Sequence, residues 1–160
     1  VLSLWFPENS SSVNEEFVTM LEGVPFVAAL LLIALMPAVC EEMMFRGYLY
    51  AAFRQKMGMT RVILLVSLLF GFSHMSLIRF LPTMLLGIAL AYARYRSDSL
   101  LVSALMHFLN NAYSVCILYY GDTIEWLKDE KMGIPLIAGL VVMAVIGIPA
   151  GAGILKGSAQ

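Results

Sequence analysis

The sequence predicts an all-α integral membrane protein, a bundle of about five transmembrane helices around a central polar site within the membrane. Of its 160 residues, 61% are hydrophobic and only 13% are charged, and the mean hydropathy is +0.85. A water-soluble globule of this size does not need so apolar a chain. Because hydrocarbon offers no partner to unpaired backbone groups, the apolar runs should be helical. The net charge of −1 provides no basic surface for nucleic acid, so we expect no nucleic-acid partner.

The apolar runs follow one another along the chain and define the predicted helices. These cover about residues 24–54, 62–77, 80–95, 100–120 and 133–155. The first run is longer than the roughly 20 residues that one crossing needs, so this helix should tilt or extend beyond the bilayer. The second run is short for a crossing. Pro37 lies inside the first run and should bend it, because proline lacks a backbone donor.

Polar segments flank the helical region on both sides. Residues 1–24 are polar and acidic, and Ser12 and Glu15 have the spacing of a capping box, which predicts a short interfacial helix. Residues 156–160 form a tail, so the helical membrane domain should span 25–155. The chain begins with valine, and no n-region or cleavage site precedes the first apolar run. We therefore expect a fragment of a longer chain, with a fused or associated membrane domain.

Basic residues gather in alternate loops of the predicted bundle. They are Arg54, Lys56 and Arg61 before the second helix, Arg94 and Arg96 before the fourth, and Lys156 after the fifth. Loops rich in lysine and arginine stay in the cytoplasm, and the opposite ends of these helices carry mainly aspartate and glutamate. The sequence therefore predicts a multi-pass protein with its N-terminus outside and its C-terminus in the cytoplasm.

Three of the apolar runs carry polar side chains deep in the bilayer. Counting 1.5 Å per residue from the cytoplasmic edge, the expected depths are about 18 Å for Glu42, 20 Å for His74, 12 Å for His107 and 18 Å for Asn111. These side chains come from separate helices and reach similar levels. We therefore expect them to meet in one polar layer near the middle of the membrane.

The first helix carries the charged part of this layer. Each ionised residue at a helix centre costs roughly 2.5–3.5 kcal/mol on insertion, so such residues should be paired or functional. Glu42 and Arg46 are four residues apart, lie on one helix face and can pair. Glu41 is turned by about 100° from Glu42. The pattern therefore predicts Arg46 as an internal counter-ion of Glu42 and leaves Glu41 free for chemistry.

The second and fourth predicted helices carry the uncharged part of the layer. Phe70 and His74 are four residues apart, as are His107 and Asn111, and the glycine at position 71 should allow close helix approach. A carboxylate beside a histidine can hold and deprotonate a water molecule. A His–Asn pair can donate hydrogen bonds to the oxyanion that forms when this water attacks a peptide carbonyl. The residues therefore contain the parts needed for amide hydrolysis.

The three motifs also resemble those of a known family. "EEMMFR", "FGFSH" and "HFLNN", which together span residues 41–111, are similar to the EExxxR, FxxxH and HxxxN motifs of the CAAX-protease and bacteriocin-processing family (CPBP, also ABI) of intramembrane proteases, related to the Ras-converting CAAX endopeptidases. The resemblance implies a helical membrane endopeptidase domain at 25–155. In the implied mechanism, Glu41 and His74 activate water, His107 and Asn111 stabilise the oxyanion, and Glu42, Arg46 and Phe70 support them.

Members of this family are commonly labelled metalloproteases, and the resemblance leaves two mechanisms open. A zinc ion held by Glu41, His74 and His107, as a three-ligand catalytic site requires, would leave Glu42 as the base. That role conflicts with the pairing of Glu42 to Arg46, so we prefer a mechanism that requires no cofactor. The implied partners are the lipid bilayer and a peptide or protein substrate, with or without a lipid modification.

Two other classes of function use the same features. Midplane glutamate and histidine residues also mark ion paths, so a membrane transporter or a proton-relay component is the alternative. Against it, the sequence lacks the pair of broken helices in matching halves that inverted-repeat transporters have. The third interpretation is a non-catalytic membrane scaffold attached to a larger protein.

Overall fold

The computed structural model describes residues 19, 21, 23–121 and 123 of the chain. This part is built from helices and their connections and contains no strand, in agreement with the predicted all-α class. The predicted helix at 133–155, the 156–160 tail and nearly all of the 1–24 flank lie outside the described residues.

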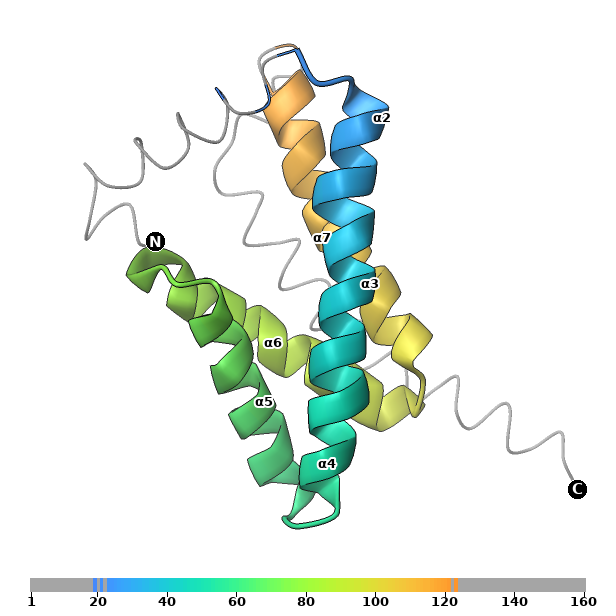
Figure 1. Ribbon diagram of the computed structural model, residues 1–160, viewed down its shortest axis with the longest axis vertical. Helices are drawn as coiled ribbons and strands as arrows, with labels where there is room; N and C mark the ends of the chain where they lie inside the picture. The colour runs from blue at the N-terminus through green and yellow to red at the C-terminus, as the bar shows by residue number, and fades with distance from the viewer. Residues whose placement is uncertain (1–18, 20, 22, 122, 124–160) are drawn as a thin grey trace, which may run out of the picture.

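The first long helix runs from Phe26 to Arg54, in agreement with the first predicted run. It comprises α2 (Phe26–Ala29), the π-helical stretch η1 (Leu30–Leu35), α3 (Met36–Glu42), the π-helical stretch η2 (Met43–Leu49) and α4 (Tyr50–Arg54). Pro37 lies in the first turn of α3, directly after η1. Pro37, which has no N–H to donate, therefore lies where the π-helical hydrogen-bond pattern of η1 gives way to the α-helical pattern of α3. The helix continues past the proline (Figure 1).

The next two helices, α5 (Met59–Ser73) and α6 (Leu77–Ser97), form a hairpin whose turn corrects the predicted helix at 62–77. That prediction places the turn inside a helix. In the structure, Met75 adopts a left-handed conformation with a φ of 48°, and the hydroxyl of Ser76 accepts a hydrogen bond from the backbone N–H of Arg79 at 3.4 Å. Ser76 thus caps α6, and the chain reverses immediately after His74.

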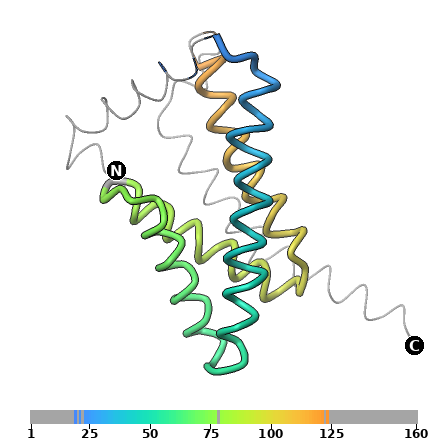
Figure 2. The backbone as a smooth tube through the Cα atoms, in the orientation of Figure 1, coloured from blue at the N-terminus to red at the C-terminus, as the bar shows by residue number. Residues whose placement is uncertain are grey.

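The last described helix, α7 (Leu100–Tyr120), has the predicted bounds. It follows Asp98, which takes the left-handed conformation at the end of α6 with a φ of 50°. α7 packs along η1 and α3 of the first helix, α5 packs along α6, and α6 also contacts α7. The smooth trace in Figure 2 shows the same arrangement, with the hairpin of α5 and α6 beside the pair formed by α7 and the first helix.

Two glycines bring α5 and α6 close together. A Cβ atom on Gly71 would lie 3.1 Å from the Cβ of Met84 and from the ring of Phe80. A Cβ atom on Gly87 would lie 3.2 Å from the Cα of Ser67 and from the ring of Phe70. The close approach predicted at Gly71 is confirmed, and Gly87 provides a second one from the opposite helix.

Two described helices, Phe26–Arg54 and Leu100–Tyr120, are long and apolar enough to cross a membrane, and α5 is apolar but shorter. The first helix leaves many large apolar side chains exposed along its length, namely Val27, Leu31, Leu32, Leu35, Met36, Val39, Met43 and Met44. Such a surface is costly in water and favourable against lipid. The described part is therefore a helical bundle with an outer face suited to a membrane.

Candidate active site

The end of α3 and the start of η2 carry the predicted ion pair. Arg46 donates from Nη1 to Oε1 of Glu42 at 2.7 Å, and both side chains are fully buried. The predicted pairing is confirmed. Because a buried charge left alone is strongly destabilising, each of these two residues requires the other.

Arg46 also connects the first helix to the hairpin. Its Nη2 donates to the backbone carbonyl of Gly87 in α6 at 2.9 Å. The guanidinium carbon lies 4.4 Å from the centre of the Phe70 ring, within the range of a cation–π contact. Arg46 is therefore held by a carboxylate from its own helix, a carbonyl from α6 and an aromatic face from α5.

His107 of α7 lies between the two glutamates. Its Nδ1 is 3.2 Å from Oε1 of Glu42, and its Nε2 is 3.8 Å from Oε2 of Glu41. The two carboxylates differ in access, because the Glu41 side chain is 33% exposed and that of Glu42 is fully buried. Oε2 of each glutamate is buried and has no hydrogen-bond partner among the described residues, so exposure is what separates the two side chains. Glu41 therefore faces a histidine and is open on one side, whereas Glu42 is closed in by Arg46 and His107.

His74 lies at the C-terminal end of α5, where it is partly buried. Its Nδ1 is 2.9 Å from the carbonyl oxygen of Phe70. A carbonyl oxygen can only accept a hydrogen bond, so Nδ1 carries the proton and, in the neutral ring, Nε2 keeps its lone pair. The helix end thus fixes the orientation of the ring.

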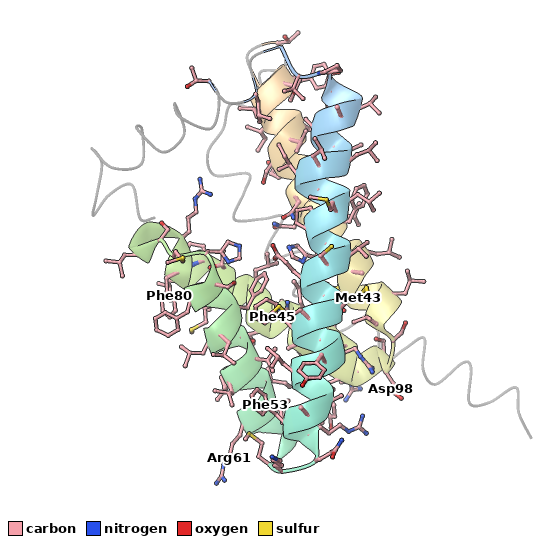
Figure 3. All side chains as sticks on the ribbon, in the orientation of Figure 1. Met43, Phe45, Phe53, Arg61, Phe80 and Asp98 are labelled. Carbon is pink, nitrogen blue, oxygen red and sulfur yellow. The ribbon has the colours of Figure 1, made fainter. Side chains whose placement is uncertain are left out.

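Phe70, a predicted supporting residue, lies at the centre of this group. Its buried ring is in edge-to-face contact with His74, with His107 and with Phe45, at centroid distances of 5.0, 5.6 and 5.2 Å. Figure 3 shows Phe45 on the side of the first helix that faces α5 and α6, while Met43 is exposed on its outer side. Phe70 therefore connects both histidines and lies under the Arg46 guanidinium.

Asn111 lies one turn beyond His107 on α7 and has different neighbours. Its side-chain Nδ2 is 3.5 Å from the carbonyl oxygen of Ile33, and its Oδ1 accepts from Asn110 at 3.3 Å. The Ile33 carbonyl is four residues before Pro37, so it lacks the α-helical N–H partner that proline cannot provide. Within the described part of the chain, Asn111 makes no hydrogen bond to His107.

The polar side chains of this region include few possible metal ligands that lie close together. Among the described residues, no group of three or more His, Cys, Asp or Glu side chains is placed to hold a metal ion. The predicted alternative set, Glu41, His74 and His107, therefore does not form a three-ligand site as these side chains lie, and we derive no step through a metal.

One member of this group, the Gly87 carbonyl, is not among the residues that the sequence predicts for the site. Every residue has a main-chain oxygen, so the residue type does not show which of these oxygens accepts a hydrogen bond from a charged donor. A glycine in an apolar helix is no exception. The one available signal is the small-residue character of α6 around Gly87, Ala89 and Ala91, which is also common in ordinary helix packing.

Comparison with known proteins identifies the family. No curated protein and no solved structure matches the chain. A family model described as "Type II CAAX prenyl endopeptidase Rce1-like" matches residues 23–113, more than half of the chain and the whole of the motif region. The chain therefore belongs to the Rce1-like family of type II CAAX prenyl endopeptidases, a family of membrane peptide hydrolases.

Proposed function

We propose that this protein is an intramembrane endopeptidase that hydrolyses peptide bonds near the membrane. In this proposal Glu41 and His74 activate a water molecule, and His107 and Asn111 stabilise the oxyanion. The observation that carries the proposal is the contrast between two neighbouring carboxylates. Glu42 is fully buried and paired with Arg46, whereas the Glu41 side chain is 33% exposed.

Glu41 is suited to act as the general base. Its carboxylate can accept a hydrogen bond from water, take a proton as the water oxygen attacks the peptide carbonyl, and later give that proton to the leaving amine. Glu42 is unsuited to this role, because its side chain is fully buried and its Oε1 already accepts from both Arg46 and His107.

His74 would hold the same water molecule from a second side. With its Nδ1 proton directed to the Phe70 carbonyl, the neutral ring offers Nε2 as an acceptor for the other water proton. A water molecule held by two acceptors has an oxygen lone pair free for attack.

His107 and Asn111 would stabilise the negative charge that develops on the carbonyl oxygen. For His107 to donate from Nε2 while Nδ1 bonds Glu42, the ring must carry both protons, and the two flanking carboxylates compensate this charge. Asn111 would have to exchange its bond to Ile33 for one to the oxyanion. At 3.5 Å that bond is at the limit of hydrogen bonding, so its loss costs little.

The proposed setting is a multi-pass membrane protein with an outer N-terminus and a cytoplasmic C-terminus. The proposed substrates are peptides or proteins at the membrane, including prenylated ones of the kind that the family's name describes. The proposed mechanism requires no metal. A fused or associated membrane domain is part of the same proposal.

The decisive experiment compares Glu41→Gln with the unaltered chain in proteoliposomes, with a prenylated and an unprenylated CAAX peptide as substrates. Loss of the general base should lower the cleavage rate by roughly 10²–10⁴-fold. Cys40→Ser is the matched control, because Cys40 precedes Glu41 on the same helix and is exposed. Cleavage at the normal rate in Glu41→Gln would overturn the proposal, and solute flux without any cleavage would support the transporter alternative.

A chelator arm of the same assay tests the metal. Turnover that persists in samples shown by elemental analysis to lack zinc supports the mechanism without a cofactor. Turnover that stops with the chelator and returns with added zinc would contradict it.

A further inference from the structure

A buried chain of hydrogen bonds links α6 to α7 through the first helix. The Gly87 carbonyl accepts from Arg46, Arg46 donates to Glu42, and the same Glu42 oxygen meets Nδ1 of His107, at 2.9, 2.7 and 3.2 Å. We propose that this chain is a positioning relay that fixes the proton of His107 on Nδ1 and turns Nε2 toward Glu41, with Gly87 as its anchor on α6. The importance of His107 for cleavage rests on the proposed function, whereas the orientation of its ring does not.

The direction of every bond in the relay is determined by its groups. A carbonyl oxygen only accepts and a guanidinium only donates, so the bond from Arg46 to Gly87 has one possible polarity. Oε1 of Glu42 accepts from Arg46 at 2.7 Å, which identifies it as a carboxylate oxygen without a proton. His107 must then donate from Nδ1. Its Nε2 is the atom left to face Oε2 of Glu41 at 3.8 Å.

Burial makes this arrangement rigid. Glu42 and Arg46 are fully buried and His107 is 2% exposed, so water cannot replace a lost partner. A change at the Gly87 end would therefore reach His107 through two fully buried side chains whose charged groups lie 2.7 Å apart.

Gly87 contributes through its missing side chain as well as its carbonyl. A Cβ atom there would lie 3.2 Å from the Phe70 ring and from the Ser67 backbone, so alanine would push α6 away by a few tenths of an ångström. Phe70 is also the ring under the Arg46 guanidinium. Alanine at position 87 would therefore disturb both contacts that hold Arg46 from the hairpin side.

The test is to determine which ring nitrogens are protonated in His74 and His107. The chain has only these two histidines, so their signals can be assigned. The full chain is labelled with ¹⁵N-histidine in lipid nanodiscs, and His74→Gln assigns the two sets of ring signals. At neutral pH the Nδ1 of His107 should be protonated and hydrogen-bonded. A neutral His107 ring with its proton on Nε2 and a bare Nδ1 would overturn the relay.

Two glycine variants then test the anchor. Gly87→Ala should shift the His107 ring signals more than Gly71→Ala, which crowds the same helix pair at 3.1 Å but against Met84 and Phe80 and not against Phe70. Equal shifts in both variants would mean general crowding and would remove Gly87 from the relay. If Gly87→Ala does not accumulate, Arg46→Lys replaces it, because lysine keeps the charge but lacks the planar fork, and the same shift is expected.

Kinetics separate this inference from the proposed function. Gly87→Ala should lower kcat by roughly 10- to 100-fold through misplacement of His107, with KM within about twofold of the unaltered chain. If the unaltered chain cleaves no peptide, the proposed function fails while the ring signals still decide the relay. If cleavage is normal and Nδ1 is bare, the relay alone fails.

Discussion

Two arginine–carboxylate pairs with the same spacing lie in different parts of this molecule. Glu42 and Arg46 are four residues apart in the middle of the bundle, with a contact of 2.7 Å. Arg94 and Asp98 are four residues apart at the end of α6, with a contact of 2.9 Å. The first pair is completely buried, whereas the Asp98 side chain is 79% exposed. Spacing and distance are nearly equal, so the difference between the pairs is their surroundings.

The surroundings give the two pairs different consequences. Arg46 and Glu42 each have a further partner on another helix, so their pair connects α6, the first helix and α7. Asp98 has a second cation, Arg54, at 3.8 Å, but that side chain is also largely exposed. Water and salt can replace partners at the exposed site and not at the buried one. We therefore expect removal of one partner to be severe in the first pair and mild in the second.

The largest effect is expected for Arg46→Met, which leaves the Glu42 charge buried without its cation. The free energy of unfolding, measured by reversible SDS unfolding in mixed micelles, should fall by about 3–5 kcal/mol. Arg96→Met is the control, because Arg96 is exposed and should tolerate the change. Adding Glu42→Gln to Arg46→Met should recover part of the loss, since it removes the unpaired charge. If Arg46→Met alone were as stable as the unaltered chain, burial would not be what makes this ion pair important.

A smaller effect is expected for Phe70→Leu, which keeps an apolar side chain but removes the aromatic face and edges. The variant loses the cation–π contact with Arg46 and the ring contacts with both histidines, together about 1–3 kcal/mol of unfolding free energy. Phe72→Leu is the matched control, because Phe72 is on the same helix and exposed. Equal losses in both variants, measured by the same SDS titration, would mean that Phe70 acts only as ordinary packing.

Local spacing made much of this arrangement predictable. Glu42 and Arg46 pair because a helix brings residues four apart onto one face, whatever the rest of the chain does. The count of depth along the helices was less accurate: it put Asn111 level with Glu42 at about 18 Å and His107 at about 12 Å, whereas His107 is the residue that contacts Glu42. The bounds of α7 followed from the length of its apolar run.

The features that the sequence did not predict depend mainly on contacts between segments that are far apart in the chain. The partner of His107 in the structure is Glu42, sixty-five residues away, and not Asn111 on its own helix. Helical spacing shows which residues share a face, but helix packing decides what that face meets. The end of α5 was missed for a different reason: Met75 takes a left-handed conformation that an apolar sequence does not announce.

The smallest effect is expected for Asp98→Asn, which removes the carboxylate of the exposed ion pair. Asparagine tolerates the left-handed conformation that Asp98 adopts, so the substitution removes the charge without straining the backbone. Because Arg94 and Arg54 can turn to water, the unfolding free energy should change by only about 0–1 kcal/mol, and less at high salt. Peptide cleavage should stay normal. A loss of unfolding free energy as large as that of Arg46→Met would mean that the exposed pair stabilises the protein as strongly as the buried pair. Burial would then not explain the difference between the two ion pairs.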